Sequence, residues 1–93
     1  MNARPTLAEP VIVSEFWANR SGESVRVQLR EYEGQPLLDV RKYFTDSDGK
    51  LQPTKKGISI AIARLPDLAS AINRAVDKAR ELKLIHERIA GQP

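Results

Sequence analysis

Hydrophobic and polar residues alternate along the first two thirds of the chain, and this alternation predicts a β-sheet. In the segment 24–32, the aliphatic residues stand at every second position and are separated by polar or charged ones. A period of two is typical of a strand with one buried face. The pattern and the β-branched and aromatic residues predict strands at 11–18, 24–32, 37–44 and 55–63. Residues that favour turns separate these strands at Asn19–Gly22, Glu33–Gly34 and Asp46–Gly49.

Beyond the last predicted strand, apolar residues recur at every third or fourth position, which predicts a helix. Pro66 fits the first turn of a helix, and the carboxylate of Asp67 complements its positive end. No glycine or proline interrupts the pattern between Asp67 and Gly91. We therefore expect one long C-terminal helix from about Leu65 to Ile89, roughly 36 Å long at 1.5 Å per residue.

The predicted order β-β-β-β-α places the protein in the α+β class. The aliphatic face of the strands and the apolar stripe of the helix should pack together. So long a helix would overhang a small sheet and leave Leu82, Ile85 and Ile89 exposed in a monomer. We therefore predict a homodimer that pairs through its helices. Residues 1–10 are expected to form a flexible N-terminal arm, and residues 11–90 a single domain.

Composition argues against an enzyme and against a metal or cofactor site. The 93 residues include no cysteine and one histidine, His86, so no catalytic triad or thiolate site can be assembled. Asp46–Gly49 could suggest a calcium loop, but the twelfth position of that pattern is Gly57 rather than Glu, so we interpret it as a turn. No apolar stretch is long enough to span a membrane, and the N-terminus lacks a signal pattern, so we expect an intracellular protein.

The basic charge of the predicted sheet suggests nucleic acid as a ligand. The net charge is +3, and residues 20–64 hold nine Lys or Arg against six Asp or Glu. Cations release counterions from nucleic-acid phosphates, and aromatic rings stack on unpaired bases. Both kinds of side chain fall in the predicted sheet, at Arg26, Arg30, Tyr32, Arg41, Tyr43, Phe44, Lys55 and Lys56, with Gly57 beside the two lysines.

Plainer readings stay open for several of these residues. A charged sheet face can serve solubility alone, and lysines on an edge strand also oppose aggregation. Asp39 lies on the basic face, where we expect it to pair with Arg41 or Arg26. Trp17 is expected in the core or in a dimer interface rather than as a platform for bases.

The segment from Val25 to Ile60 resembles the C-terminal domain of the transcriptional coactivator family called positive cofactor four, in particular its compact prokaryotic members. The family's D-x-R-x-Y-[WF] strand, its acidic-Gly turn and its P-x-x-K-G-I-S segment occur here in order at 39–44, 46–49 and 53–59. The resemblance implies a four-stranded antiparallel sheet followed by a long helix. It also implies helix-paired dimers whose sheets line grooves for melted or single-stranded DNA, with little sequence preference.

Carried onto this chain, the resemblance implies base stacking by Tyr32 and Phe44. It implies phosphate contacts by Arg41, Lys55 and Lys56, with Gly57 beside them. Glu33 and Gln35 stand where lysines are common in the family, and Phe44 stands where tryptophan is common. These changes lower the charge and the stacking area of the groove.

We therefore predict a sequence-tolerant single-stranded DNA-binding protein that acts as a transcription cofactor or as a nucleoid or repair accessory protein. Two alternatives stay open: a protein-interaction module that contacts RNA polymerase or other transcription proteins, and an RNA-binding chaperone that uses the same groove. The expected location is the cytoplasm, at the nucleoid, in a prokaryote and the nucleus in a eukaryote.

Overall fold

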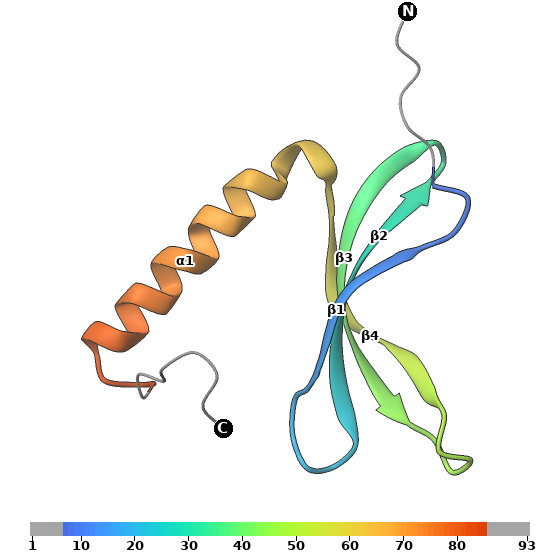
Figure 1. The fold of residues 1–93 in the computed structure, drawn as a ribbon, viewed down its shortest axis with the longest axis horizontal. Coiled ribbons are helices and arrows are strands. Elements are labelled where there is room, and N and C mark those ends of the chain that lie inside the picture. Colours follow the sequence, from blue (N-terminus) through green and yellow to red (C-terminus); the bar gives the residue numbers. More distant parts are fainter. Residues whose placement is uncertain (1–6, 86–93) are drawn as a thin grey trace, which may run out of the picture. The chain divides into compact units, whose positions relative to one another are not determined.

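The computed structural model describes residues 7–85, which form four strands followed by a 3₁₀ turn and one helix (Figure 1). The strands pair in the order β1-β2-β3-β4, and every neighbouring pair is antiparallel. The predicted order β-β-β-β-α and the α+β class are therefore confirmed. The bounds are β1 (Val11–Trp17), β2 (Glu23–Tyr32), β3 (Gln35–Thr45), β4 (Leu51–Ala61), η1 (Ile62–Arg64) and α1 (Leu65–Glu81).

The chain divides into two compact units between Ala63 and Arg64, one holding the sheet and the other the helix. The expected packing of the helix on the sheet stays a prediction. Most of the expected arm, residues 1–6, lies outside the described residues. Its end is attached to the sheet, because the backbone N–H of Leu7 donates a 3.1 Å hydrogen bond to the Glu31 carboxylate.

Two turns that join the strands follow the sequence prediction. Glu33 and Gly34 have φ angles of 50° and 79°, and two-residue hairpins of type I′ require positive φ at both positions. In the next turn, the Asp46 carboxylate accepts backbone hydrogen bonds from Asp48 and Lys50, at 2.8 and 2.9 Å. The acidic side chain thus stabilises the hairpin between β3 and β4.

Strand β4 begins four residues earlier than predicted, at Leu51 rather than Lys55. The register shifts between Arg41 and Tyr43, which pair with Gly57 and Pro53 respectively, so β4 bulges opposite Lys42. Because β4 lies at the edge of the sheet, the missing N–H of Pro53 does not interrupt a ladder on both sides. The strand can therefore continue through a proline that the sequence pattern treated as a break.

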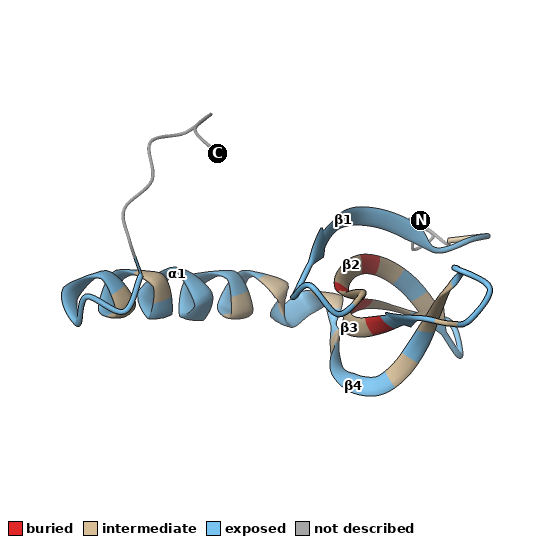
Figure 2. Cartoon of the chain, turned by 90° about the horizontal axis from the view of Figure 1, so that it is seen from below, coloured by how far each residue is buried: buried red, intermediate tan, exposed pale blue. Residues whose placement is uncertain are grey.

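The buried residues of the described chain lie on the two central strands, β2 and β3 (Figure 2). They are Ser24, Gln28, Leu38, Asp39 and Tyr43. All of them except Leu38 lie on the face that the sequence marked as polar, because Ser24 pairs with Tyr43 and Gln28 with Asp39. The aliphatic face is covered less completely, and Ile58 on β4 is exposed. The long side chains of Arg26 and Arg41 lie over the polar face, where they contact Tyr43 and Asp39.

Helix α1 starts where the sequence predicted but ends eight residues earlier, at Glu81. Lys83 adopts the left-handed conformation with φ of 60°, and its N–H donates to the Arg80 carbonyl at 2.9 Å. The N–H of Leu84 donates to the Ala79 carbonyl at 2.7 Å. This pair of bonds is the Schellman arrangement that ends helices. At 1.5 Å per residue, the 17 residues of α1 span about 26 Å.

The early end changes the picture of the predicted dimer interface. Leu82 and Ile85 are exposed, as expected, but they follow the helix rather than extend its apolar stripe. Ile89 and His86 lie outside the described residues. Pairing of two copies through this region stays a prediction.

Gly57 on β4 gives the first testable prediction. A Cβ atom at this position would lie 2.5 Å from the Val40 carbonyl oxygen and 2.8 Å from the Arg41 Cα, both backbone atoms of β3. We expect Gly57→Ala to lower the free energy of unfolding by about 1–3 kcal/mol, because β3 and β4 must separate to admit the methyl group. Chemical denaturation measures this change. Lys55→Ala, an exposed neighbour, is the control and should change stability by less than about 0.5 kcal/mol. Equal stability of Gly57→Ala and wild type would contradict the close approach.

Candidate functional site

The strand register places the candidate residues in rows across one side of the sheet. We call this side the polar face and define it as the residues that share the side of Asp39. The central row consists of Glu15, Arg26, Arg41 and Gly57. The row on one side of it consists of Trp17, Ser24, Tyr43 and Pro53. The row on the other side consists of Ile12, Gln28, Asp39 and Ser59. Arg30 and Tyr32 continue the polar face toward the turn between β2 and β3.

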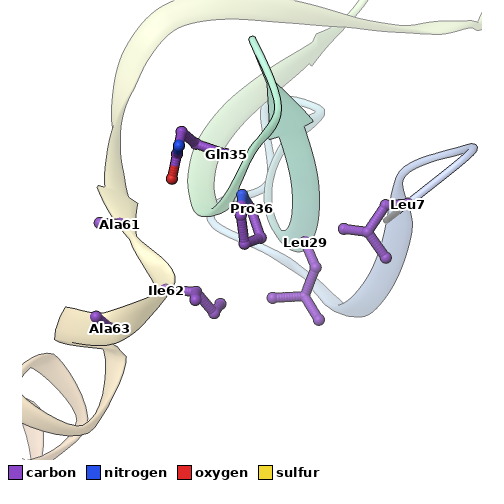
Figure 3. A pocket seen from close by; sticks show the side chains of 7 residues that line it. All are labelled: Leu7, Leu29, Gln35, Pro36, Ala61, Ile62 and Ala63. Atoms are coloured by element: carbon purple, nitrogen blue, oxygen red, sulfur yellow. The ribbon is translucent and has the colours of Figure 1, made fainter. Parts of the chain in front are cut away.

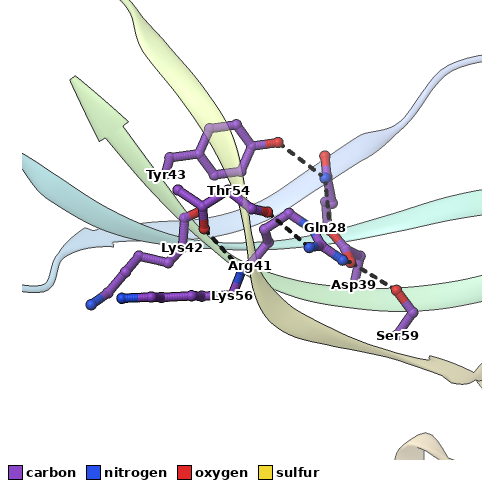
Figure 4. A network of polar contacts seen from close by, with 8 residues as sticks. All are labelled: Gln28, Asp39, Arg41, Lys42, Tyr43, Thr54, Lys56 and Ser59. Atoms are coloured by element: carbon purple, nitrogen blue, oxygen red, sulfur yellow. Dashed lines mark hydrogen bonds and ion pairs between the residues drawn. The ribbon is translucent and has the colours of Figure 1, made fainter. Parts of the chain in front are cut away.

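Asp39 lies at the centre of a hydrogen-bond network on the polar face (Figure 4). Its side chain accepts bonds from Arg41 at 2.8 and 3.2 Å, from Ser59 at 2.9 Å and from Gln28 at 3.2 Å. Asp39 is only 1% exposed. These donors come from β2, β3 and β4, so the network joins three strands. The expected pairing of Asp39 with Arg41 is confirmed.

The network keeps Asp39 ionised. Burial alone would raise the pKa of the Asp39 carboxyl, but the hydrogen bonds from Arg41, Ser59 and Gln28 outweigh burial and lower it. Arg41 also donates a 2.9 Å hydrogen bond to the Thr54 carbonyl on β4. Its guanidinium is therefore occupied within the sheet and is only partly open to a ligand.

Arg26 is occupied in a similar way. It forms an ion pair with Glu15 on β1 at 2.9 Å, and its guanidinium carbon lies 4.2 Å from the centre of the Tyr43 ring. Burial acts to lower the pKa of Arg26, but the hydrogen bond and charge of Glu15, together with Tyr43, outweigh burial and raise the pKa. The charges of Arg26 and Arg41 are thus offset by carboxylates.

Three other predicted cations and one ring are open to solvent. Arg30, Lys55 and Lys56 are exposed, and among the described residues none of the three forms an ion pair. Tyr32, next to the turn between β2 and β3, is 65% exposed. Among the described residues, no side-chain hydrogen bond or ion pair occupies these groups, so they can contact a ligand without breaking one.

Phe44 does not join the other predicted residues on the polar face. Its register partner is Glu23, which forms a 3.3 Å ion pair with Lys42, so Phe44 lies on the aliphatic side, in phase with Lys42. Lys42 and Lys56 extend in the same direction in Figure 4, away from the Asp39 network. The bond from Asn19 and the charges of Lys42 and Lys56 lower the pKa of Glu23.

The predicted surface is therefore divided between the two sides of the sheet. Phe44, which is 41% exposed, has Lys42 on its own side as a cation that sequence reasoning missed. The alternation of side chains along β3 could have predicted that Lys42 and Phe44 share a face, because residues 42 and 44 point to one side of a strand and residues 41 and 43 to the other.

Gly57 has a role within the fold in addition to the one expected at a ligand. The sequence suggested that glycine lets the backbone approach a phosphate. The structure gives a reason within the fold, since a side chain at Gly57 would collide with the backbone of β3 at Val40 and Arg41.

An apolar cavity of about 480 Å³ lies at the end of the sheet that holds the turn between β2 and β3. Leu7, Leu29 and Ile62 point into the same space (Figure 3). Its other lining residues are Gln35, Pro36, Ala61 and Ala63. None of these side chains titrates or acts as a nucleophile, so the cavity offers no catalytic group.

Within residues 7–85, no group of three or more acidic, histidine or cysteine side chains could hold a metal ion. Over the same residues, no helix is both long and apolar enough to cross a membrane.

Comparison with known proteins gives a consistent set of relatives. The family model of the Transcriptional Coactivator p15 (PC4) matches residues 19–71. A curated relative, a putative RNA polymerase II transcriptional coactivator of Neurospora crassa, is 35% identical over 57 residues, which are 61% of this chain and 31% of that protein. The chain thus spans about a third of the length of this relative.

Two solved structures share the fold. The crystal structure of BPSL1147, a PC4 homolog from Burkholderia pseudomallei, matches with a TM-score of 0.66 and 25% identity, over 77% of this chain and 96% of that one. A bacteriophage T5 homolog of the coactivator PC4, implicated in recombination-dependent DNA replication, matches with a TM-score of 0.51 and 22% identity, over 84% and 83%. At this identity, the phage protein supports the fold alone.

The lowered pKa of Asp39 predicts a pH dependence of stability. Asp39→Asn should lower the free energy of unfolding by about 1–3 kcal/mol at neutral pH, because it leaves Arg41 without its carboxylate. The folded protein takes up the Asp39 proton less readily than the unfolded chain, whose pKa is near 3.8. The carboxylate therefore stabilises fully above about pH 4, and this contribution is lost as the pH falls through the lower folded-state pKa.

Denaturation of wild type and Asp39→Asn across pH 2–7 tests this, and their difference should shrink on the acid side. Asp48→Asn, in an exposed turn, is the control and should cost less than about 0.5 kcal/mol at neutral pH. A difference that stays constant down to pH 2 would show that the Asp39 charge does not contribute.

Proposed function

Because the chain belongs to the Transcriptional Coactivator p15 (PC4) family, we propose that it binds single-stranded or melted DNA with little sequence preference. In this proposal the sheet is the binding surface, and the protein acts as a transcription cofactor or as an accessory protein of the nucleoid or of repair. The observation that carries the proposal is the set of exposed cations and rings whose side chains form no hydrogen bond or ion pair within the described residues.

Phosphate binding is supported by the exposed positions of Arg30, Lys55 and Lys56. Because these cations need not break an ion pair to bind a phosphate, they can replace condensed counterions at low cost. Arg26 and Arg41 remain in the proposed surface as weaker contributors, since Glu15 and Asp39 already offset their charges.

Base stacking is supported by Tyr32 and Phe44, but these rings lie on different sides and at opposite ends of the hairpin of β2 and β3. Residue 32 and the register partner of Phe44, Glu23, are nine positions apart, which is at most about 30 Å along a strand. A flexible single strand can follow such a path around the edge strand β4, whereas a rigid duplex cannot. The geometry thus favours unpaired over paired DNA.

The proposed partners follow from the same family membership. We propose a homodimer and a contact with the transcription machinery, since the curated relative is described as an RNA polymerase II coactivator. The proposed location is the nucleoid region of the cytoplasm in a prokaryote and the nucleus in a eukaryote.

Fluorescence anisotropy with labelled oligo-dT, at low and moderate salt, tests the proposal. Binding that weakens steeply as salt rises is the expected result. Absence of binding at low salt would overturn the proposal and favour a protein-interaction module. Stronger binding of RNA of the same length would assign the surface to RNA.

The two lysines of the β4 bulge give a quantitative prediction. Lys55→Ala with Lys56→Ala should weaken binding of every sequence and reduce the slope of log K against log salt by about 1.4, if each lysine meets one phosphate of a single strand. The same anisotropy titrations at several salt concentrations measure the slope. Arg74→Ala with Lys78→Ala removes the same charge from exposed positions of α1 and should leave the slope unchanged. Equal slopes for wild type and the β4 variant would exclude both lysines from the phosphates.

Each of the two exposed rings gives a second prediction. Tyr32→Ala and Phe44→Ala should each weaken binding by about 1–3 kcal/mol, with little effect on the salt slope, because stacking does not displace ions. Tyr32→Phe keeps a stacking ring and should retain most of the affinity. If Tyr32→Phe loses as much as Tyr32→Ala, the hydroxyl rather than the ring is important at that position.

A further inference from the structure

A small cavity near the end of β1, lined by residues of β1, β2 and β4, has the features of a binding pocket. It has a volume of about 170 Å³ and is lined by Glu15, Phe16, Trp17, Ser24 and Leu51. Pockets for drug-sized ligands are about 300–1,000 Å³. This cavity therefore suits a single ring rather than an extended molecule.

Trp17 provides an aromatic wall of this cavity. The sequence suggested the core or a dimer interface for Trp17; at 66% exposed it does not lie in the core of the chain, and a place in a dimer interface stays a prediction. As the register partner of Ser24, Trp17 lies at the end of a row that also contains Tyr43. An exposed indole beside a hollow is a surface on which a flat ring can stack.

Ser24 supplies an independent sign of a ligand. Its residue is only 2% exposed, yet its Oγ has no hydrogen-bond partner among the described residues. Buried hydroxyls are nearly always hydrogen-bonded, and an unpaired one costs free energy. The Oγ is itself closed to solvent, so a polar atom of a ligand would satisfy it once the Ser24 side chain rotates toward the cavity that this residue lines.

The charged groups next to the cavity are paired, so they do not exclude a nucleic-acid ligand. The neighbouring row carries Arg26 and Arg41, whose guanidinium groups are held by Glu15 and Asp39. A backbone phosphate beside the cavity would meet two oriented guanidinium groups. The hydroxyl of Ser24 can donate or accept, so it can pair with the edge of any base.

We propose that this cavity is a subsite for one base of the bound single strand, in which the base stacks on Trp17 and hydrogen-bonds to the Oγ of Ser24. The subsite rests on the proposed DNA binding and adds β1 to the binding surface. It is compatible with low sequence preference, because neither contact selects one base.

Trp17 is the sole tryptophan of the chain, so its fluorescence reports on this site directly. Titration of unlabelled oligo-dT should quench Trp17 emission over the same concentration range in which labelled oligo-dT gains anisotropy. Trp17→Ala should weaken binding about 5-fold to 150-fold, whereas Trp17→Phe should retain most of the affinity. Val13→Ala, an exposed β1 residue that does not line the cavity, should bind as wild type does.

Ser24→Ala separates a binding role from a structural one. It removes a buried hydroxyl that has no partner in the free protein, so the melting temperature should stay the same or rise. The affinity for oligo-dT should nevertheless fall about 2-fold to 10-fold. A fall in melting temperature with unchanged affinity would overturn the role assigned to Ser24.

The outcomes distinguish this subsite from the proposed function. If labelled oligo-dT binds but Trp17 emission does not change and Trp17→Ala binds normally, the subsite is refuted while DNA binding stands. If the emission of free protein resists quenching by acrylamide, another surface covers Trp17, and this too refutes the subsite. Absence of binding in the anisotropy titration refutes both.

Discussion

The polar face depends on the burial of one carboxylate. An ionised group as inaccessible as Asp39 is strongly unfavourable unless hydrogen bonds replace its water. Arg41, Gln28 and Ser59 provide these bonds from three adjacent strands. A register shift of one residue would turn Asp39 to the other side and away from its donors. The network therefore fixes the register of the sheet, and with it the place of every side chain on either face.

The same network decides which positive charges remain for a ligand. Arg26 and Arg41 look like phosphate contacts in the sequence, but in the fold they compensate Glu15 and Asp39. The unpaired positive charge of the sheet therefore lies on the edge strand β4 and at the end of β2, and not at the centre of the sheet. A count of basic residues misses this redistribution, because it depends on pairings between distant parts of the chain.

Local patterns predicted the strands, the turns and the start of the helix, because each is determined by neighbours in sequence. The start of β4 was wrong because a bulge and an edge position, both tertiary features, allow pairing beyond Pro53. Phe44 was grouped with Arg41 by motif, although alternation alone places it with Lys42 on the other side. The exposure of Trp17 and the unpaired hydroxyl of Ser24 depend on the fold, and no sequence pattern marks them.

The C-terminal end of α1 is held by few interactions. Lys83 occupies a left-handed conformation that suits glycine, at a cost of about 1–2 kcal/mol, and two backbone bonds from Lys83 and Leu84 offset that cost. The end of α1 therefore depends on one strained residue and two backbone hydrogen bonds. Burial of Leu82 and Ile85, both exposed here, would favour a further turn over this strained end. A surface that covers those residues would therefore act on where the helix ends.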